Sequence, residues 1–188
     1  QNMSAIKLDG ELLAAEVREA LKQRILKLER QGVRPGLGTI LVGNDGPSEN
    51  YVAMKHRDCK ELGMHSNEIK LPETATQEDI LSAVDSMNND SEIHAFIIQY
   101  PFPDGLDYES ALMQVLPHKD ADGLHPVNLG RLVQGVEAPL ACTPAGIQLL
   151  LERFEVPITG QHIVIIGRGL TIGRPLANLL SLKRPNAN

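Results

Sequence analysis

Apolar positions along the chain follow two different periods, and each period predicts one type of element. Between residues 9 and 31 the apolar side chains recur every three or four positions, as on one face of a helix; they are Leu13, Val17, Leu21 and Leu28. Asp9 is of a type that caps helix N-termini, and Gly32 is of the type that follows helix ends. The pattern therefore predicts a helix over 9–31.

Short uninterrupted apolar runs predict buried strands. The runs are "LGTILVG" at 37–43 and "HAFIIQY" at 94–100, and a weaker strand signal lies at 65–71. Helical patterns separate these runs, one over 48–62 that Gly63 closes and one that begins at the cap Thr76. Strand, helix, strand, helix, strand is the order of a parallel α/β sheet with helices on both faces, and we predict that fold.

The second half of the chain has a different character. Residues 116–144 carry Pro, Gly and His with little periodicity and are predicted to be loops that join two domains. A helix is then expected with Thr143 as N-cap and Pro144 in its first turn, followed by a strand over 162–167 and a helix over 173–183. One strand and one helix cannot bury a sheet, so this second domain is expected to be incomplete.

Composition and charge narrow the function classes. The chain is 42% apolar and 22% charged, with a net charge of −6, which argues against a nucleic-acid surface. No apolar run approaches the roughly 18 residues of a membrane helix. Cys59 and Cys142 lie far apart and form neither a metal-ligand spacing nor a disulfide framework, so a reduced cytosolic setting is expected.

A glycine-rich loop follows the strand predicted at 162–167. In "GRGLTIG" the glycines are Gly167, Gly169 and Gly173, one residue longer than the usual GxGxxG. Such glycines let a backbone approach a pyrophosphate at a helix N-terminus, and Arg168 could pair with a phosphate. The alternative is a tight turn that binds nothing, with Arg168 as a solvated surface residue.

Three further polar features stand out. Tyr51 and Lys55 share one face of the helix predicted at 48–62. The pair is either a catalytic lysine beside an aromatic ring or a surface lysine whose stem lies over a tyrosine. Gln99 falls at the carboxyl end of a buried strand, where ligands bind in open α/β sheets. Asp120 and Asp122 lie in the polar loop "HKDADG". They either accept hydrogen bonds from a ligand or cap the turn in which they lie. A Tyr-x-x-x-Lys pair also occurs in short-chain dehydrogenases, but there it follows the glycine loop.

The motifs together are more specific than any one of them. "SENYVAMKHRDCKELG", "IIQYPFP", "HKDADGLHPVNLGRL", "CTPAG" and "GRGLTIGRPLANLL" occur in this order from about residue 4 to the end of the chain. In this they resemble the bifunctional methylenetetrahydrofolate dehydrogenase/cyclohydrolase family. The resemblance implies two α/β domains flanking a cleft, with a parallel-sheet domain over 4–138 and a Rossmann-like domain from 139 to 188 that is expected to be cut short.

The same resemblance implies an activity and its partners. The enzyme would oxidise 5,10-methylenetetrahydrofolate to the methenyl form with NADP, and would hydrolyse that form to 10-formyltetrahydrofolate. It would be a cytoplasmic homodimer with a folate substrate and no nucleic-acid or membrane partner. A folate- or nucleotide-binding fragment without activity is the alternative, because the cofactor domain is short.

Roles for single residues also follow from the resemblance. Lys55 resembles the catalytic lysine, Tyr51 the ring that stacks on the pterin side, and Gln99 the residue that holds the lysine. Asp122 resembles the pterin anchor and Ser48 a hydroxyl near the site, while Gly167, Arg168, Gly169 and Gly173 resemble the cofactor loop. Three departures matter: Gly169 stands where a serine is usual, Tyr100 stands where a leucine is usual, and the cofactor domain is expected to be cut short.

Overall fold

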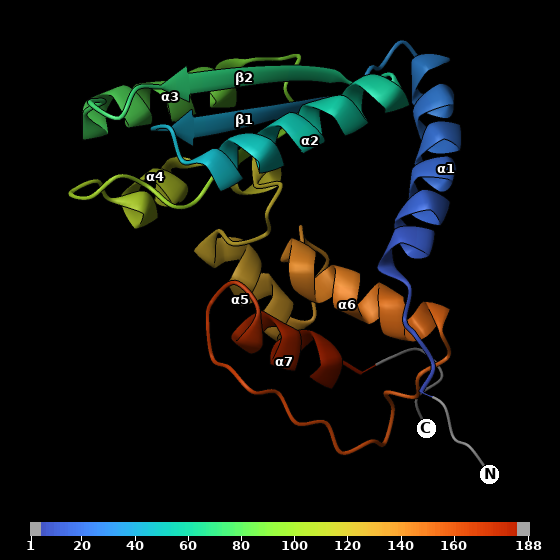
Figure 1. Ribbon diagram of the computed structural model, residues 1–188. Coiled ribbons are helices and arrows are strands. Elements are labelled where there is room, and N and C mark those ends of the chain that lie inside the picture. Colours follow the sequence, from blue (N-terminus) through green and yellow to red (C-terminus); the bar gives the residue numbers. More distant parts are fainter. Residues whose placement is uncertain (1–4, 184–188) are drawn as a thin grey trace.

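A three-stranded parallel sheet forms the centre of the larger part of the molecule (Figure 1). The computed structural model describes residues 5–183. Strand β1 (Gly36–Val42) lies in the middle and pairs in parallel with β2 (His65–Leu71) on one side and β3 (Ala95–Ile98) on the other. The predicted parallel α/β fold is confirmed, and it places the carboxyl ends of all three strands at one edge.

The first helix, α1 (Gly10–Glu29), begins where the sequence predicts. The Asp9 side chain accepts hydrogen bonds from the backbone N–H groups of Glu11 and Leu12, each at 3.1 Å. The helix ends with Arg30 as C-cap, ahead of Gly32, whose φ of 78° lies in the left-handed region that glycine favours. Within the described part of the chain, no helix is both long and apolar enough to cross a membrane.

Helices α2 (Gly46–Leu62) and α3 (Gln77–Asn89) cover opposite faces of the sheet, as predicted. Helix α2 begins two residues before the predicted start and ends at Gly63, which has a φ of 76°. Thr76 caps α3 in a capping box with Asp79: the Thr76 hydroxyl accepts from the Asp79 N–H, and the Asp79 carboxylate accepts from the Thr76 N–H.

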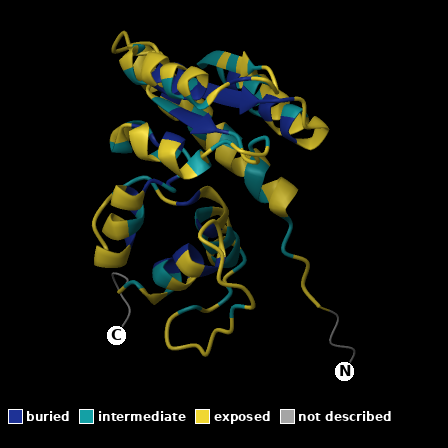
Figure 2. Cartoon of the chain, turned by 90° about the vertical axis from the view of Figure 1, so that its left-hand side faces the viewer, coloured by how far each residue is buried: buried dark blue, intermediate teal, exposed yellow. Residues whose placement is uncertain are grey.

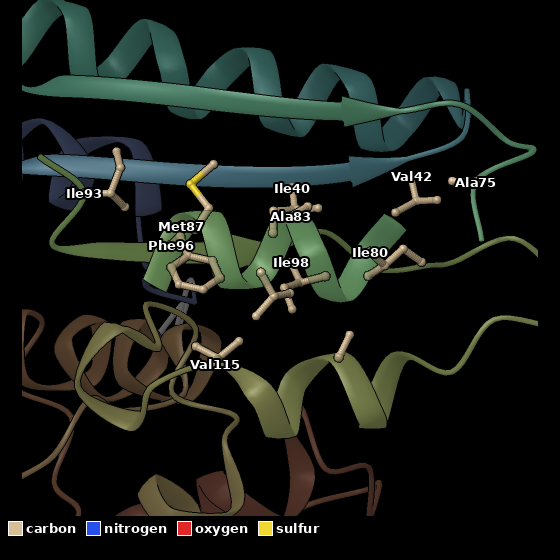
Figure 3. Packing of buried hydrophobic residues seen from close by; sticks show 12 residues of the cluster. Ile40, Val42, Ala75, Ile80, Ala83, Met87, Ile93, Phe96, Ile98 and Val115 are labelled. Carbon is tan, nitrogen blue, oxygen red and sulfur yellow. The ribbon is translucent and has the colours of Figure 1, made fainter. Parts of the chain in front are cut away.

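The hydrophobic core lies between the sheet, α3 and the following helix α4 (Tyr108–Gln114) (Figure 3). Aliphatic side chains dominate it, with Phe96 from β3 as its one fully buried aromatic ring. The labelled members are Ile40, Val42, Ala75, Ile80, Ala83, Met87, Ile93, Phe96, Ile98 and Val115. This packing makes β1 and β3 a rigid support for whatever projects from their carboxyl ends.

The segment predicted to be loops contains a helix, which corrects that prediction. After the short 3-10 turn η1 (Pro117–Lys119), residues Pro126–Gln134 form α5. His125 caps this helix, because its Nδ1 accepts a hydrogen bond from the Val127 N–H at 3.1 Å. Histidine is not a usual N-cap, and the nine-residue helix is too short to show a clear period, so the sequence pattern did not reveal it.

Two predictions for the last third of the chain are also wrong. Helix α6 (Cys142–Arg153) starts before Thr143, since the Ala145 N–H already bonds to the Ala141 carbonyl, and Ala141 is the N-cap. Residues 162–167 form no strand within the described chain, where no neighbouring strand pairs with them. Most of these residues are exposed, with Val164 at 74% and Ile166 at 99%, while Ile165 is half-buried (Figure 2).

Helix α7 (Gly173–Ser181) closes the described chain and packs on α5 and α6. These three helices form a second layer beside the sheet, and α1 runs along both layers (Figure 1). The Arg153 guanidinium of α6 donates two hydrogen bonds to the Glu16 carboxylate of α1, both at 2.7 Å. This paired contact joins the two parts of the molecule.

The start of β1 allows no side chain, which gives a test of the sheet. A methyl group on Gly36 would overlap the backbone carbonyl oxygen of Glu92. We therefore expect Gly36→Ala to lower the free energy of unfolding by about 2–3 kcal/mol, because a backbone atom has to move.

The matched control is Gly130→Ala in α5, where no atom lies within contact of the added methyl group. This change should be neutral or stabilising by up to about 1 kcal/mol, because alanine favours a helix. Urea unfolding of both variants measures the difference, and equal stabilities would contradict the packing at Gly36.

Candidate active site

Side chains from three separate segments converge at the carboxyl end of β3. The Gln99 backbone N–H donates to the Ile40 carbonyl at 2.9 Å, which fixes Gln99 at the end of the strand. From α2, Lys55 Nζ donates to Gln99 Oε1 at 3.4 Å, and Gln99 Nε2 donates to the Tyr100 carbonyl at 2.9 Å. Both ends of the amide are therefore engaged, which orients its oxygen toward the lysine.

A cavity of about 370 Å³ opens at this point, a size that suits a small organic ligand. Lys55, Gln99 and Asp122 all line it, so the structure brings together three of the residues singled out from the sequence. The other lining residues are Ile97, Ile98, Tyr100, Tyr108, Leu124, Cys142, Thr143 and Thr171. The walls are thus mainly apolar, with a few polar groups that can fix the orientation of a ligand.

Asp122 is an unusual carboxyl group within this cavity. Burial raises its pKa from an ordinary 3.8 to about 6, because the charged form loses contact with water. The positive charge of Lys55 opposes this rise, and the negative charge of Asp120 adds to it. The group can therefore exchange a proton near neutral pH, as functional carboxyl groups in clefts often do.

Two cavity residues were missed by the sequence analysis as site residues. Burial raises the pKa of the Tyr108 phenol above its ordinary value, and the carboxylates of Asp122 and Asp120 raise it further. Although Cys142 keeps part of its surface open, burial raises the pKa of its thiol to about 11, and its Sγ donates to the Ala121 carbonyl at 3.3 Å. The one sequence signal for Cys142 is its position in the motif "CTPAG".

Neither Tyr51 nor Ser48 is among the lining residues of the cavity. Lys55 Nζ is 5.9 Å from the centre of the Tyr51 ring, and that ring is 57% exposed, so its face is open to a ligand. Ser48 is buried in the first turn of α2, where its hydroxyl donates to Asp45 Oδ2 at 2.6 Å. In this arrangement Ser48 supports the start of the helix that carries Tyr51 and Lys55.

The glycine loop approaches the same cavity from the second layer. Gly167 has a φ of 137°, and a methyl group on Gly173 would overlap the Gly167 carbonyl, so both positions require glycine. Arg168 is exposed, and the space beside the Gly169 backbone is open. Thr171 reaches the cavity wall, which puts this loop next to the site that holds Lys55 and Asp122.

Another hollow, of about 390 Å³, lies between residues 158–165 and α7. Its walls include Ile163, Ile165 and Leu180, and among residues 5–183 no ionisable side chain lines it. It offers no group for acid–base chemistry, so we place the candidate active site at the cavity beside β3.

Comparisons with known protein families agree with this arrangement in two parts. Residues 8–122 match the family described as tetrahydrofolate dehydrogenase/cyclohydrolase, catalytic domain, and residues 141–188 match its NAD(P)-binding domain. The chain is 52% identical over 186 residues to the bifunctional protein FolD of Syntrophotalea carbinolica. This alignment covers 99% of the chain and 64% of that relative, so the chain spans less than two thirds of the relative's length.

Solved structures of such enzymes have the same fold. The bifunctional enzyme FolD from Campylobacter jejuni is 37% identical with a TM-score of 0.89, over 92% of this chain and 62% of that one. The Trypanosoma brucei dehydrogenase-cyclohydrolase, solved with NADP cofactor and inhibitor, is 34% identical with a TM-score of 0.90, over 94% and 61%.

Because the pKa of Asp122 is raised, we expect that replacing its carboxyl group with a neutral amide makes the folded protein more stable. The folded-state pKa of about 6 lies above the ordinary 3.8, so folding of the unsubstituted protein becomes less favourable as pH rises from 4 to 6. At pH 8 we expect Asp122→Asn to raise the free energy of unfolding by about 2 kcal/mol. The gain should disappear as pH falls toward 4.

The control is Asp104→Asn, an exposed carboxyl group in the turn after β3. Its effect on stability should stay within about 0.5 kcal/mol at either pH. Urea unfolding at pH 4.5 and pH 8 compares the variants, and a gain for Asp122→Asn that does not depend on pH would argue against the titration.

Proposed function

Because the chain belongs to the tetrahydrofolate dehydrogenase/cyclohydrolase family, we propose that the whole protein interconverts one-carbon forms of tetrahydrofolate. It oxidises 5,10-methylenetetrahydrofolate to the 5,10-methenyl form with NADP, and it hydrolyses that form to 10-formyltetrahydrofolate. The observation that carries this proposal is the convergence of Lys55, Gln99 and Asp122 on one cavity.

The cavity suits the pterin end of a folate. Asp122 supplies a carboxylate that can accept hydrogen bonds from an amino-substituted heterocycle, which fixes its orientation. Ile97, Ile98 and Leu124 offer apolar walls for the flat ring system. The exposed ring of Tyr51, beside Lys55, gives a face on which the pterin-side rings stack.

The glycine loop suits a dinucleotide. The open space beside Gly169 lets a diphosphate approach the backbone, and α7 begins after Ile172 with no side chain capping its first turn. In that first turn the Arg174 N–H donates to the Gly169 carbonyl at 3.1 Å and Pro175 has no N–H, so among the described residues the Gly173 N–H is the first-turn donor that can bind a phosphate oxygen. Gly167, Gly169 and Gly173 shape this loop and Arg168 supplies a cation, and the related T. brucei structure with NADP supports the choice of cofactor.

In the oxidation step, the chain mainly aligns the reactants. When bound, the nicotinamide of NADP accepts the hydride that leaves the one-carbon bridge. Asp122 holds the pterin and Tyr51 stacks on the pterin-side rings, and Thr171 of the glycine loop lines the same cavity, so the loop lies next to the bound folate. The hydride's departure leaves a positive charge on the bridge of the folate, and the negative charge of Asp122 in the cavity and of the buried Asp120 behind it favours that charge.

In the hydrolysis step, the chain moves a proton. Water adds to the cationic carbon and gives up one proton to the solvent, which balances the lost positive charge. One carbon–nitrogen bond then breaks, and the second proton of that water must reach the departing nitrogen. Lys55 Nζ lies in the cavity wall where it can carry this proton, and Gln99 Oε1 holds it there at 3.4 Å.

The organisation of the whole protein belongs to the same proposal. We place the folate domain at 4–138 and the start of the cofactor domain at 139–188, a division that the two matched ranges support. The family resemblance supports a cytoplasmic homodimer. A net charge of −6 disfavours nucleic acid as a partner, and we expect no membrane partner. A binding fragment without activity is less well supported, because binding alone does not require the contact between Lys55 and Gln99.

The proposal predicts a selective loss at Lys55. In the whole protein, Lys55→Met should lower cyclohydrolase activity by ~100-fold or more, because the proton carrier is gone and the apolar stem remains. The free energy of unfolding should change little. The assay is hydrolysis of methenyltetrahydrofolate above its spontaneous rate, and near-normal hydrolysis would exclude Lys55 from the mechanism. Lys60→Met, an exposed lysine of the same helix, is the control.

A second prediction concerns Arg168 and the 2′-phosphate that distinguishes NADP from NAD. Arg168→Ala should weaken NADP binding by roughly 10- to 100-fold and leave NAD binding little changed, because a charge-assisted hydrogen bond is lost. The effect should shrink at high salt. Cofactor titrations at two salt concentrations test this, with Arg131→Ala in α5 as the charge-matched control. Equal losses for both cofactors would assign Arg168 another role.

A further inference from the structure

Asp120 is a buried carboxylate for which the catalytic proposal has no use. Its side chain is 3% exposed, and among the described residues no lysine, arginine or histidine forms an ion pair with it. Its Oδ2 accepts two hydrogen bonds, one from the His125 N–H at 2.9 Å and one from Asn128 Nδ2 at 2.8 Å. A buried charge held only by neutral donors is costly, so its position calls for an explanation.

The partner Asn128 is fully buried and oriented for this contact. Its Nδ2 donates to both Asp120 Oδ2 and the Pro117 carbonyl, the latter at 2.7 Å. Its Oδ1 has no hydrogen-bond partner within the described part of the chain. Leaving a buried carbonyl unsatisfied is unfavourable, so the two donor bonds outweigh that loss. The network is thus organised around holding the Asp120 carboxylate in place.

The backbone on either side of Asp122 is fixed as well. Asp120 pairs with Phe96 in a parallel bridge, and the Ala121 N–H donates to the Phe96 carbonyl at 3.2 Å. Gly123 follows with a φ of 67°, and a methyl group there would overlap the backbone of Leu140. Asp122 therefore stands on a short stretch of chain that is held at both ends.

Four groups from different elements act on the Asp122 carboxyl or share its surroundings. Lys55 of α2 lowers its pKa, Asp120 of its own loop raises it, and Tyr108 of α4 and Cys142 of α6 line the same cavity. The charge of Asp120 also raises the pKa values of Tyr108 and Cys142. The charge of the buried Asp120 carboxylate thus shifts the pKa values of three groups that line the cavity, although Asp120 itself is not a lining residue.

We propose that Asp120 is a positioning residue that holds the Asp122 loop on the sheet and sets the electric field at the Asp122 carboxyl group, without touching the substrate. The role has two separable parts, a mechanical one through the two hydrogen bonds and an electrical one through the charge. The inference rests on the proposed function in that Asp122 is taken as the folate anchor.

Two substitutions separate the parts because both hydrogen bonds end on the same oxygen. In Asp120→Asn, the amide oxygen can take the place of Oδ2 and accept from both His125 and Asn128, while the charge is removed. In Asp120→Ala, the hydrogen bonds and the charge are both removed. Asp104→Asn removes one negative charge from an exposed turn and serves as the control.

The first readout needs no ligand. Carbon-13 NMR of the Asp122 side-chain carboxyl, assigned with Asp122→Asn, gives the pH at which it titrates. We expect a midpoint near pH 6 in the unsubstituted protein, and a midpoint lower by about 0.5–1.5 pH units in Asp120→Asn. Asp104→Asn should leave the midpoint where it is. An unchanged midpoint in Asp120→Asn would overturn the electrical part.

The second readout follows the mechanical part. Amide hydrogen exchange at His125 should be slowed in the unsubstituted protein and in Asp120→Asn, and should become at least about tenfold faster in Asp120→Ala. This exchange can be measured in the unsubstituted protein even if a variant does not fold. Exchange at the unprotected rate there would overturn the mechanical part.

Binding of a folate analogue, measured against pH, connects both parts to function. The pH at which affinity is half lost should move down in Asp120→Asn together with the NMR midpoint, while affinity at pH 8 changes less than about threefold. If the unsubstituted protein binds no folate analogue at any pH, the proposed function fails. The two ligand-free readouts still decide the role of Asp120 in that case.

Discussion

The pairing of residue 120 with Phe96 is the contact on which the rest of the site depends. The sheet supplies Gln99 from its own strand and Lys55 from the helix that covers it. Asp122 comes from a separate loop, and it reaches the cavity only because the parallel bridge adds this loop to the edge of β3. The aliphatic core beneath β1 and β3 keeps that edge rigid. A candidate site residue on a loop is thus held in place by the sheet.

The sequence predicts the parts of this fold that are set by local pattern. The buried strands, the cap at Thr76 and the end of α2 at Gly63 follow from hydrophobic period and cap chemistry, and the structure confirms them. The strand expected at 162–167 depends on partners, and the described chain offers none, so most of its apolar side chains stay exposed. Helix α5 escaped notice because an unusual histidine cap begins it.

The candidate site shows the same division between local and long-range information. The motifs of the chain point to Lys55, Gln99 and Asp122, and the structure brings these three to one cavity. Tyr108 and Thr171 reach that cavity through packing between segments distant in sequence, which no local pattern encodes. Ser48 was singled out from the sequence but does not line the cavity, and its hydroxyl donates to Asp45 at the start of α2.

The joint between the two layers has a mechanical consequence. Glu16 and Arg153 tie α1 to α6 through a paired contact whose side chains are 41% and 45% exposed. Dissolved ions screen such a contact, whereas they barely affect the buried apolar core. Salt therefore weakens this one contact between the layers, while the buried hydrogen bonds from His125 and Asn128 to Asp120 continue to hold α5 against the sheet.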